Sequence, residues 1–194
     1  VQLLSDPMLN NCGPSGSPAN AATLAGVMQM FIAAVDARIQ QFVDECDAEV
    51  NQAWDEENPD KKHDDCWAQT GAVDRNGEPV TVQQQLGKDK EQCVYDKMGA
   101  QDGVPQSGKG KYAGMTVTTQ KRFNPDGTPF TRGSWSGTIV PDIVMCDASG
   151  QVQAVRDLKF PCPSEQKKPG RWSRGQREKY EGAFGVSPSI ICPT

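Results

Sequence analysis

Hydrophobic residues recur at three- and four-residue spacing between residues 21 and 54, with polar residues at the intervening positions. This period predicts one long amphipathic helix over 21–54, with at most one break. A weaker pattern of the same period predicts a second helix over 80–98. Residues 1–20 and 101–113 are rich in Gly, Pro, Ser or Asn, so we expect irregular chain in both segments.

After residue 113 the helical period gives way to short apolar or threonine- and valine-rich runs, which are typical of strands. The first run predicts a strand over 115–123, and Asn-Pro-Asp-Gly-Thr at 124–128 predicts a turn. Further strands are expected over 134–146, 151–160 and 187–192, with a hairpin connection at 147–150 and a helix over 172–184. The order of these elements indicates an α+β fold.

The chain has 194 residues, of which 36% are hydrophobic, and this suits one compact domain. No run approaches the roughly 20 apolar residues that span a bilayer, and the start of the chain lacks the profile of a signal peptide. We therefore expect a soluble protein without membrane insertion. Because the chain opens at Val1 without an initiator methionine, we expect a mature fragment or a domain of a longer parent polypeptide. A secretion carrier is a further expected partner.

Charge is distributed unevenly along the chain. Residues 1–100 hold 7 basic against 17 acidic residues, and acidic residues dominate an exposed stretch that follows the first helix. Residues 101–194 hold 13 basic against 8 acidic residues. The basic cluster near the C-terminus consists of Lys167, Lys168, Arg171, Arg174, Arg177 and Lys179. Such a cluster can bind phosphate groups, and the alternative is a solvated loop and helix face.

The seven cysteines are an odd number, so at least one thiol is free or paired outside the chain. One or two disulfides and fully reduced thiols both remain open, the former in line with passage through an oxidising compartment. Cys146 and Cys162 lie in or beside apolar runs and are expected to act as small hydrophobic residues. The absence of a Cys-x-x-Cys pair and the single histidine argue against a structural zinc site.

Two other chemistries are disfavoured. Residues 103–109 have the spacing of a phosphate-binding loop, but Gly110 stands where Ser or Thr is required and no strand precedes the segment. His63 lies among charged residues without a cysteine or histidine partner at catalytic spacing. Nucleotide hydrolysis and histidine-based catalysis are therefore not expected.

The most informative chemistry is the Asp157-Leu158-Lys159 triplet. Side chains alternate across a strand, so Asp157 and Lys159 are expected on one face and Leu158 on the other. The chain contains three acidic-x-Lys triplets, where roughly 1.5 are expected by chance, but only this one lies within an apolar run. Burying both charges is unfavourable unless they bind a metal or pair with each other, and a plain ion pair is the alternative.

A second carboxylate, Asp142, follows Pro141 within an apolar run. Proline there indicates a strand edge or a bulge, which redirects a side chain. The expected hairpin at 147–150 brings Asp142 and Asp157 within reach of one divalent cation. Carboxylate oxygens suit Mg²⁺ or Mn²⁺.

Gln176 and Tyr180 stand four residues apart in the last predicted helix and share one of its faces. They are candidates for contacts at the same site. The alternative for Gln176 is a capping box with Ser173, in which its side chain only completes the helix start. The two roles are compatible.

These motifs, in this order, resemble the PD-(D/E)xK nuclease superfamily, and in particular the C-terminal toxin nuclease domains of bacterial interbacterial effectors of the type VI secretion kind. The resemblance covers about residues 115–192. It implies a restriction-endonuclease-like core, with a mixed central β-sheet flanked by helices, over residues 101–194. Residues 1–100 are then a helical, acidic N-terminal extension packed on that core, the whole forming one compact domain.

The resemblance also implies roles for individual residues. Asp142 and Asp157 are expected to bind Mg²⁺ or Mn²⁺, and Lys159 to position or activate the attacking water and stabilise charge on the phosphate. The family adds a helix glutamate, for which Glu49 is preferred over its rivals Glu45 and Glu91. The expected substrate contacts are Gln176, Tyr180, Lys167, Lys168, Arg171, Arg174 and Arg177.

The function so implied is that of a metal-dependent DNase toxin that hydrolyses phosphodiester bonds in target-cell DNA. Such a protein is a secreted bacterial effector delivered into the target-cell cytoplasm, and a cognate immunity protein neutralises it in the producing cell. The alternative is a secreted, cysteine-containing binding module that keeps a nuclease-like fold without catalysis.

Overall fold

A computed structural model describes residues 21–99, 114–162 and 171–194 of the chain. Packing divides the chain into two compact units. The sheet unit comprises the described residues of 1–36, 104–157 and 172–189, and the helix–hairpin unit those of 37–103, 158–171 and 190–194. Each unit takes segments from both sides of residue 100, so the expected division into extension and core stays a prediction. The segments expected to be irregular, 1–20 and 101–113, lie outside the described residues.

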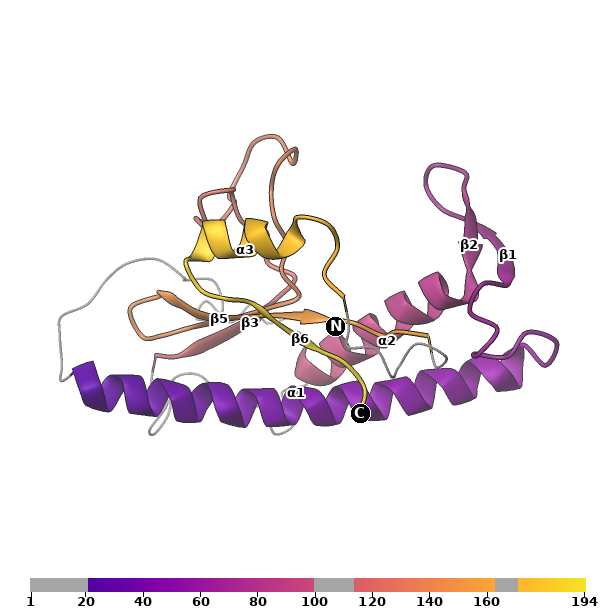
Figure 1. Cartoon of the computed structure of the whole chain (residues 1–194), viewed down its shortest axis with the longest axis horizontal. Coiled ribbons are helices and arrows are strands. Elements are labelled where there is room, and N and C mark those ends of the chain that lie inside the picture. The colour runs from indigo at the N-terminus through magenta and orange to yellow at the C-terminus, as the bar shows by residue number, and fades with distance from the viewer. Residues whose placement is uncertain (1–20, 100–113, 163–170) are drawn as a thin grey trace, which may run out of the picture. The chain divides into compact units, whose positions relative to one another are not determined.

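Both long helices are confirmed (Figure 1). Helix α1 (Ala21–Glu57) is a single unbroken helix and ends three residues beyond the predicted boundary. Its buried stripe includes Phe31, Val35, Phe42 and Cys46, at the spacing of one helix face. Helix α2 (Val82–Gly99) closely matches the second predicted helix. None of the described helices has both the length and the apolar character that a bilayer crossing requires.

A hairpin of β1 (Gln69–Val73) and β2 (Pro79–Thr81) was not predicted. Strand β1 is almost wholly exposed, so its sequence carries no alternation of apolar and polar residues. The hairpin is closed at its turn, where Asp74 Oδ1 accepts hydrogen bonds from the backbone N–H groups of Asn76 and Glu78, at 2.8 and 2.9 Å. The Asn76-Gly77 pair is the local signal that identifies such a turn in a sequence.

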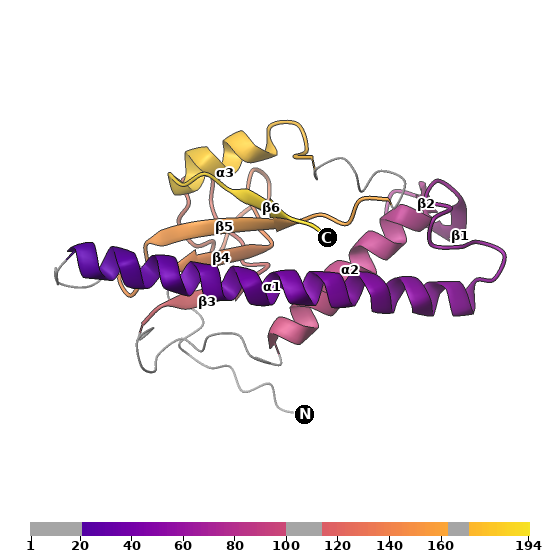
Figure 2. The same ribbon diagram turned by 60° about the horizontal axis from the view of Figure 1, so that its bottom comes forward.

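The sheet has four strands in the order β3 (Thr116–Thr119), β4 (Ile143–Cys146), β5 (Val152–Leu158), β6 (Ser189–Ile191). The first three are antiparallel neighbours, whereas β6 runs in the same direction as β5 after the chain returns through helix α3 (Gln176–Phe184) (Figure 2). The protein therefore has an α+β fold with a mixed sheet, as predicted. The hairpin turn at 147–150 is also confirmed, because the Asp147 N–H donates to the Gln151 carbonyl at 3.0 Å.

The strand predicted over 134–146 is wrong for its first nine residues, since β4 begins only at Ile143. Gly133 and Gly137 have positive φ angles of 126° and 78°, which an extended strand does not allow. The segment instead forms part of a long loop between β3 and β4. The helix predicted over 172–184 is likewise shorter, because α3 begins at Gln176.

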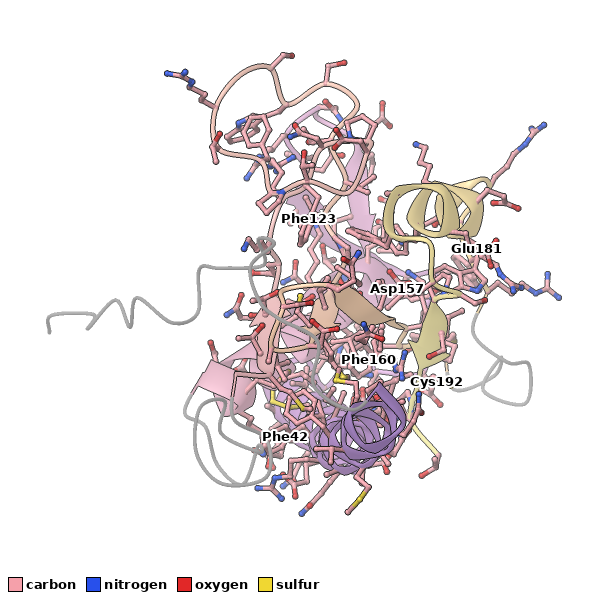
Figure 3. The ribbon with its side chains drawn as sticks, turned by 90° about the vertical axis from the view of Figure 1, so that its left-hand side faces the viewer. Phe42, Phe123, Asp157, Phe160, Glu181 and Cys192 are labelled. Carbon is pink, nitrogen blue, oxygen red and sulfur yellow. A yellow bond between two sulfur atoms is a disulfide. The ribbon has the colours of Figure 1, made fainter. Side chains whose placement is uncertain are left out.

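Strand β5 divides its side chains between the two faces of the sheet. Val155 belongs to the core cluster that α3 covers, together with Phe123, Ile139, Val144, Cys146, Tyr180 and Phe184. Arg156 points to the opposite face, where its guanidinium binds Asp36 of α1 through two hydrogen bonds of 2.8 and 2.7 Å. The β3–β4 loop lies on the α3 side of the sheet, with Phe123 at its base (Figure 3).

Cys146 and Cys162, which were expected to act as small hydrophobic residues, both form disulfides. Cys46 pairs with Cys93, and Cys66 pairs with Cys162, both within the helix–hairpin unit. Cys146 is also disulfide-bonded. The expectation that Cys146 and Cys162 act only as small hydrophobic residues is therefore wrong, although both are buried. Cys192 is a free thiol, as the odd number of cysteines requires of at least one residue.

Gly127 provides a test of the packing of the β3–β4 loop on α3. Its φ is 80°, and an added Cβ would lie 2.1 Å from the carbonyl oxygen of Ala183. Gly77 has nearly the same φ, 82°, but an added Cβ there would meet nothing within 4 Å. We expect Gly77→Ala to lower the free energy of unfolding by about 1–2 kcal/mol through left-handed strain alone. Gly127→Ala should lower it by a further 1–3 kcal/mol or so, because the loop must also move off the helix.

Urea unfolding of the two variants beside the unsubstituted protein measures this difference. Equal losses in both variants would contradict the close packing of the loop against α3.

Candidate functional site

Asp157 is the centre of the candidate site. It is the penultimate residue of β5, its side chain lies on the α3 side of the sheet, and it is 2% exposed (Figure 3). Its Oδ1 accepts a hydrogen bond from Gln176 Nε2 at 2.7 Å and lies 3.5 Å from the hydroxyl of Tyr180. Burial makes such donors necessary, because a buried carboxylate without them is strongly destabilising.

Helix α3 places Gln176 and Tyr180 on the same face, as their spacing predicted. Gln176 Nε2 also donates to the Tyr180 hydroxyl, at 3.0 Å, which links the two side chains directly. The Tyr180 hydroxyl lies 3.4 Å from the carbonyl oxygen of Val140, so its single proton can go to that carbonyl or to Asp157. Tyr180 is thereby a hydrogen-bond donor between α3 and the sheet.

Gln176 makes one hydrogen bond of the predicted capping box but does not cap the helix with Ser173. Its Oε1 accepts a hydrogen bond from the Ser173 N–H at 3.3 Å, as a capping box requires. Ser173 is not the N-cap, however, because that position belongs to Gly175 in a left-handed conformation, and no side chain caps the helix. Gln176 therefore uses its oxygen on the chain before the helix and its nitrogen on Asp157 and Tyr180.

Asp142 immediately precedes β4, after a buried Pro141. The β4–β5 ladder ends at the pair of Ile143 with Arg156, and Asp142 lies at a bend just outside it. Continuation of that register would place Asp142 opposite Asp157. The negative charges of Asp142 and Asp157 both raise the pKa of Tyr180, so both carboxylates lie near its hydroxyl. Their convergence on one cation stays a prediction.

The pKa of Tyr180 depends on its burial and on both carboxylates. Burial raises its pKa to about 12, and the negative charges of Asp157 and Asp142 act in the same direction, while the hydrogen bond from Gln176 opposes them. Tyr180 therefore keeps its proton at neutral pH. Asp142, Asp157, Gln176 and Tyr180 form what we call the carboxylate cluster, and all four belong to the sheet unit.

Lys159 follows β5 directly, is half-buried, and its backbone N–H donates to the Ile191 carbonyl at 3.0 Å. It belongs to the helix–hairpin unit. Its expected place beside Asp157, whether as a catalytic group or as a plain ion-pair partner, stays a prediction from strand alternation.

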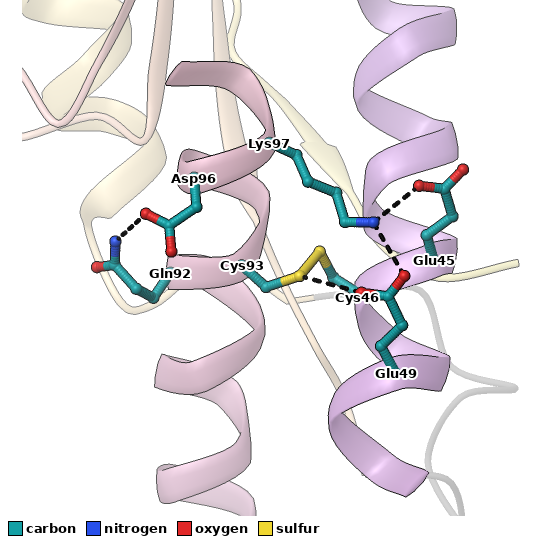
Figure 4. The surroundings of a disulfide bond; sticks show 7 residues. All are labelled: Glu45, Cys46, Glu49, Gln92, Cys93, Asp96 and Lys97. Carbon is teal, nitrogen blue, oxygen red and sulfur yellow. Dashed lines mark hydrogen bonds and ion pairs between the residues drawn. A yellow bond between two sulfur atoms is a disulfide. The ribbon is translucent and has the colours of Figure 1, made fainter. Parts of the chain in front are cut away.

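Glu49 belongs to the helix–hairpin unit, so its expected role at Asp157 stays a prediction. Its side chain is 60% exposed, and Lys97 Nζ lies 3.0 Å from both Glu49 Oε1 and Glu45 Oε2 (Figure 4). The Cys46–Cys93 disulfide adjoins this ion pair. One sulfur from each cysteine and a Glu49 oxygen lie within 4.8 Å of one another, but sulfurs joined in a disulfide are not thiolate ligands. Glu91, the remaining rival, lies on α2 in this same unit.

The basic residues of the C-terminal part are only partly described. Lys167 and Lys168 lie outside the described residues, whereas Arg171, Arg174 and Arg177 are exposed. Arg177 Nε donates to Glu181 at 2.9 Å, so its charge is partly engaged within α3. Arg174 lies two residues before Gln176 in the chain. Of these arginines, Arg174 and Arg177 belong to the same unit as the carboxylate cluster.

The arrangement offers two carboxylates near the Tyr180 hydroxyl, one of them buried at the end of β5, with neutral donors from α3. Carboxylate oxygens suit a hard divalent cation. No family model, curated protein or solved structure matches the chain.

The raised pKa of Tyr180 predicts how the cluster titrates. An unfolded tyrosine loses its proton near pH 10 while the folded Tyr180 keeps it, so the free energy of unfolding should fall between pH 10 and about 12. Absorbance titration of the phenols should show one tyrosine near pH 12, which Tyr180→Phe removes. Asp157→Asn should lower that pKa, leaving it above 10 because burial is its largest cause.

Glu178→Gln is the matched control, since Glu178 is an exposed carboxylate on the same helix. An unchanged Tyr180 pKa in Asp157→Asn would show that the two groups do not interact.

Proposed function

We propose that this protein is a metal-dependent deoxyribonuclease that hydrolyses phosphodiester bonds, built on a restriction-endonuclease-like core. The observation that carries the proposal is the burial of Asp157 beneath the Gln176 and Tyr180 side chains of α3, which bind it. With Asp142 and Lys159, these residues make up, in this chain order, the motifs that resemble PD-(D/E)xK nucleases.

Asp142 and Asp157 are the residues that would hold Mg²⁺ or Mn²⁺. The fit rests on their oxygen donors and on the nearness of both carboxylates to the Tyr180 hydroxyl. When bound, the cation would supply Lewis-acid polarisation of a phosphate and a competent nucleophile at neutral pH. The proposal does not need Glu49, whose exposed carboxylate pairs with Lys97.

Gln176 and Tyr180, the other two residues of the carboxylate cluster, orient the carboxylate of Asp157 and do not exchange protons. Gln176 fixes the Oδ1 oxygen of Asp157, and Tyr180, with a pKa of about 12, donates hydrogen bonds at neutral pH and is not a general base. Lys159 is proposed to position the attacking water and stabilise charge on the phosphate. Arg174 and Arg177, exposed at the start of α3, are proposed to bind the phosphate backbone, together with Arg171, Lys167 and Lys168.

The biological setting is part of the same proposal. A secreted bacterial effector of the type VI kind, delivered into the target-cell cytoplasm and countered by an immunity protein, would carry such a nuclease at its C-terminus. The disulfides agree with passage through an oxidising compartment, where they form and persist.

A second candidate function is a secreted binding module with a catalytically inactive nuclease-like fold. The observation that favours it is the same hydrogen-bond network. Gln176 and Tyr180 already occupy one oxygen of Asp157, so the cluster could serve only to stabilise the packing of α3 on the sheet. The two candidates differ in whether the carboxylates are needed for activity.

Incubation of the protein with plasmid DNA and Mg²⁺, with and without EDTA, distinguishes them. We expect cleavage that EDTA abolishes and that Asp142→Asn and Asp157→Asn reduce below detection, because both ligands are lost. Lys159→Ala should slow cleavage roughly 100- to 1,000-fold, the usual effect of removing one stabiliser of transition-state charge.

Glu178→Gln and Lys179→Ala are the matched controls, because both residues are exposed on α3 outside the cluster. Intact plasmid under all conditions, or cleavage that persists in EDTA and in Asp157→Asn, would refute the nuclease proposal. Substitution of an RNA substrate in the same assay tests the preference for DNA.

A further inference from the structure

The β3–β4 loop carries a tryptophan that takes no part in the core. Trp135 is 70% exposed and lies within a run of exposed residues, 131–137. The loop is anchored at its base, where Phe123 and Ile139 exchange two backbone hydrogen bonds of 2.8 and 3.0 Å. From Ile139 the chain continues within three residues to Asp142. The loop thus rises from the edge of the carboxylate cluster, on the same face of the sheet as α3 (Figures 1 and 3).

Although exposed, Trp135 is held in place by contacts with Arg122 and Thr138. The guanidinium of Arg122 lies over its ring, 4.6 Å from the centroid. Arg122 Nη1 donates to Thr138 Oγ1 at 2.6 Å, and Thr138 Oγ1 donates to the Trp135 carbonyl at 2.7 Å. These three contacts form a closed triangle within one unit. The ring therefore has a fixed position while most of its surface stays accessible.

Stability alone does not explain this arrangement. A tryptophan gains stability by burying its large apolar surface, and this ring leaves most of that surface in water. A fixed, exposed aromatic ring backed by an arginine is instead suited to stacking on another planar π system. Nucleobases stack on aromatic side chains whatever their sequence, and cationic groups beside the ring strengthen such contacts.

The charge around the ring fits the same ligand. The described segment from residue 114 to residue 141 holds three basic residues, Lys121, Arg122 and Arg132, against one acidic residue, Asp126. This balance is the reverse of the acidic net charge of −5 for the whole chain. Arg132 is exposed, whereas Lys121 and Arg122 are half-buried. An exposed aromatic ring with basic residues near it in the chain suits a phosphate backbone that carries unstacked bases.

We propose that Trp135, supported by Arg122, is a stacking platform for an unstacked base of the nucleic acid strand that the carboxylate cluster acts on. The inference rests on the proposed nuclease function and adds to it the part of the substrate that is recognised, a base and not only phosphate. It favours single-stranded or locally opened DNA over intact duplex, because a paired base has no free face to offer.

The test is a binding measurement that does not depend on cleavage. Fluorescence anisotropy of a labelled single-stranded DNA oligonucleotide, with EDTA present, gives the affinity of the full chain. We expect Trp135→Ala to weaken binding roughly 5- to 150-fold, the range for loss of one base–aromatic stack. Trp135→Phe should keep part of the affinity. Trp67→Ala is the matched control, because Trp67 is 69% exposed and belongs to the helix–hairpin unit.

An abasic oligonucleotide separates stacking from charge. The unsubstituted protein should bind it more weakly than the intact strand, while Trp135→Ala should bind both equally. Equal affinity of Trp135→Ala and the unsubstituted protein for the intact strand would overturn the inference and leave the ring to a protein partner. Absence of any binding would overturn it too. In either case the plasmid assay decides separately whether the nuclease proposal survives.

Discussion

The structure of the sheet unit depends on the burial of one carboxylate, Asp157, at the end of β5. A buried carboxylate without hydrogen-bond donors destabilises a fold by several kcal/mol, so the residues around it are constrained. Gln176 and Tyr180 supply the donors, and this fixes both the position and the rotation of α3 over the sheet. The same constraint explains why a polar pair lies within an otherwise apolar helix–sheet interface, whose remaining members are Phe123, Val155 and Phe184 and their neighbours.

The strand that carries Asp157 is also held from its other face. Arg156 binds Asp36 through two short hydrogen bonds, and alternation along the strand places this pair opposite the carboxylate cluster. Continuation of the register of β5 against β4, which ends at the pair of Ile143 with Arg156, would place Asp142 opposite Asp157. The helix–hairpin unit is stabilised differently, by the Cys46–Cys93 and Cys66–Cys162 disulfides and by ion pairs such as Lys90 with Asp47, at 2.7 Å.

The sequence predicted those features that depend on local pattern. The period of apolar residues identified α1 and α2, and turn residues identified the turn at 124–128 within the β3–β4 loop and the hairpin after β4. Helical spacing also anticipated that Gln176 and Tyr180 share a face, which the structure places against Asp157. The β1–β2 hairpin escaped prediction because its strands are exposed and carry no apolar alternation. The strand over 134–142 was overpredicted, because Gly137 within it and Gly133 just before it were not given their turn-forming role.

Contacts between residues distant in the chain were not predictable. Arg156 and Asp36 are 120 positions apart, and nothing in either local pattern indicates the other. The pairing of Cys66 with Cys162 is of the same kind, with a separation of 96. Glu49 was chosen for its place near an apolar stripe, but the stripe does not determine that Lys97 engages its carboxylate. Trp135 and Arg122 were missed because a stacked pair within an irregular loop has no period.

Direct measurement of divalent-cation binding tests the central claim, that the buried Asp157 and the facing Asp142 form a metal site. Calorimetric titration of Mn²⁺ into the unsubstituted protein should show one site, which Asp142→Asn and Asp157→Asn each abolish and Glu178→Gln retains. Thermal unfolding of each variant shows that the fold persists. Mn²⁺ binding of unchanged affinity in Asp157→Asn, or no binding to the unsubstituted protein, would contradict the account.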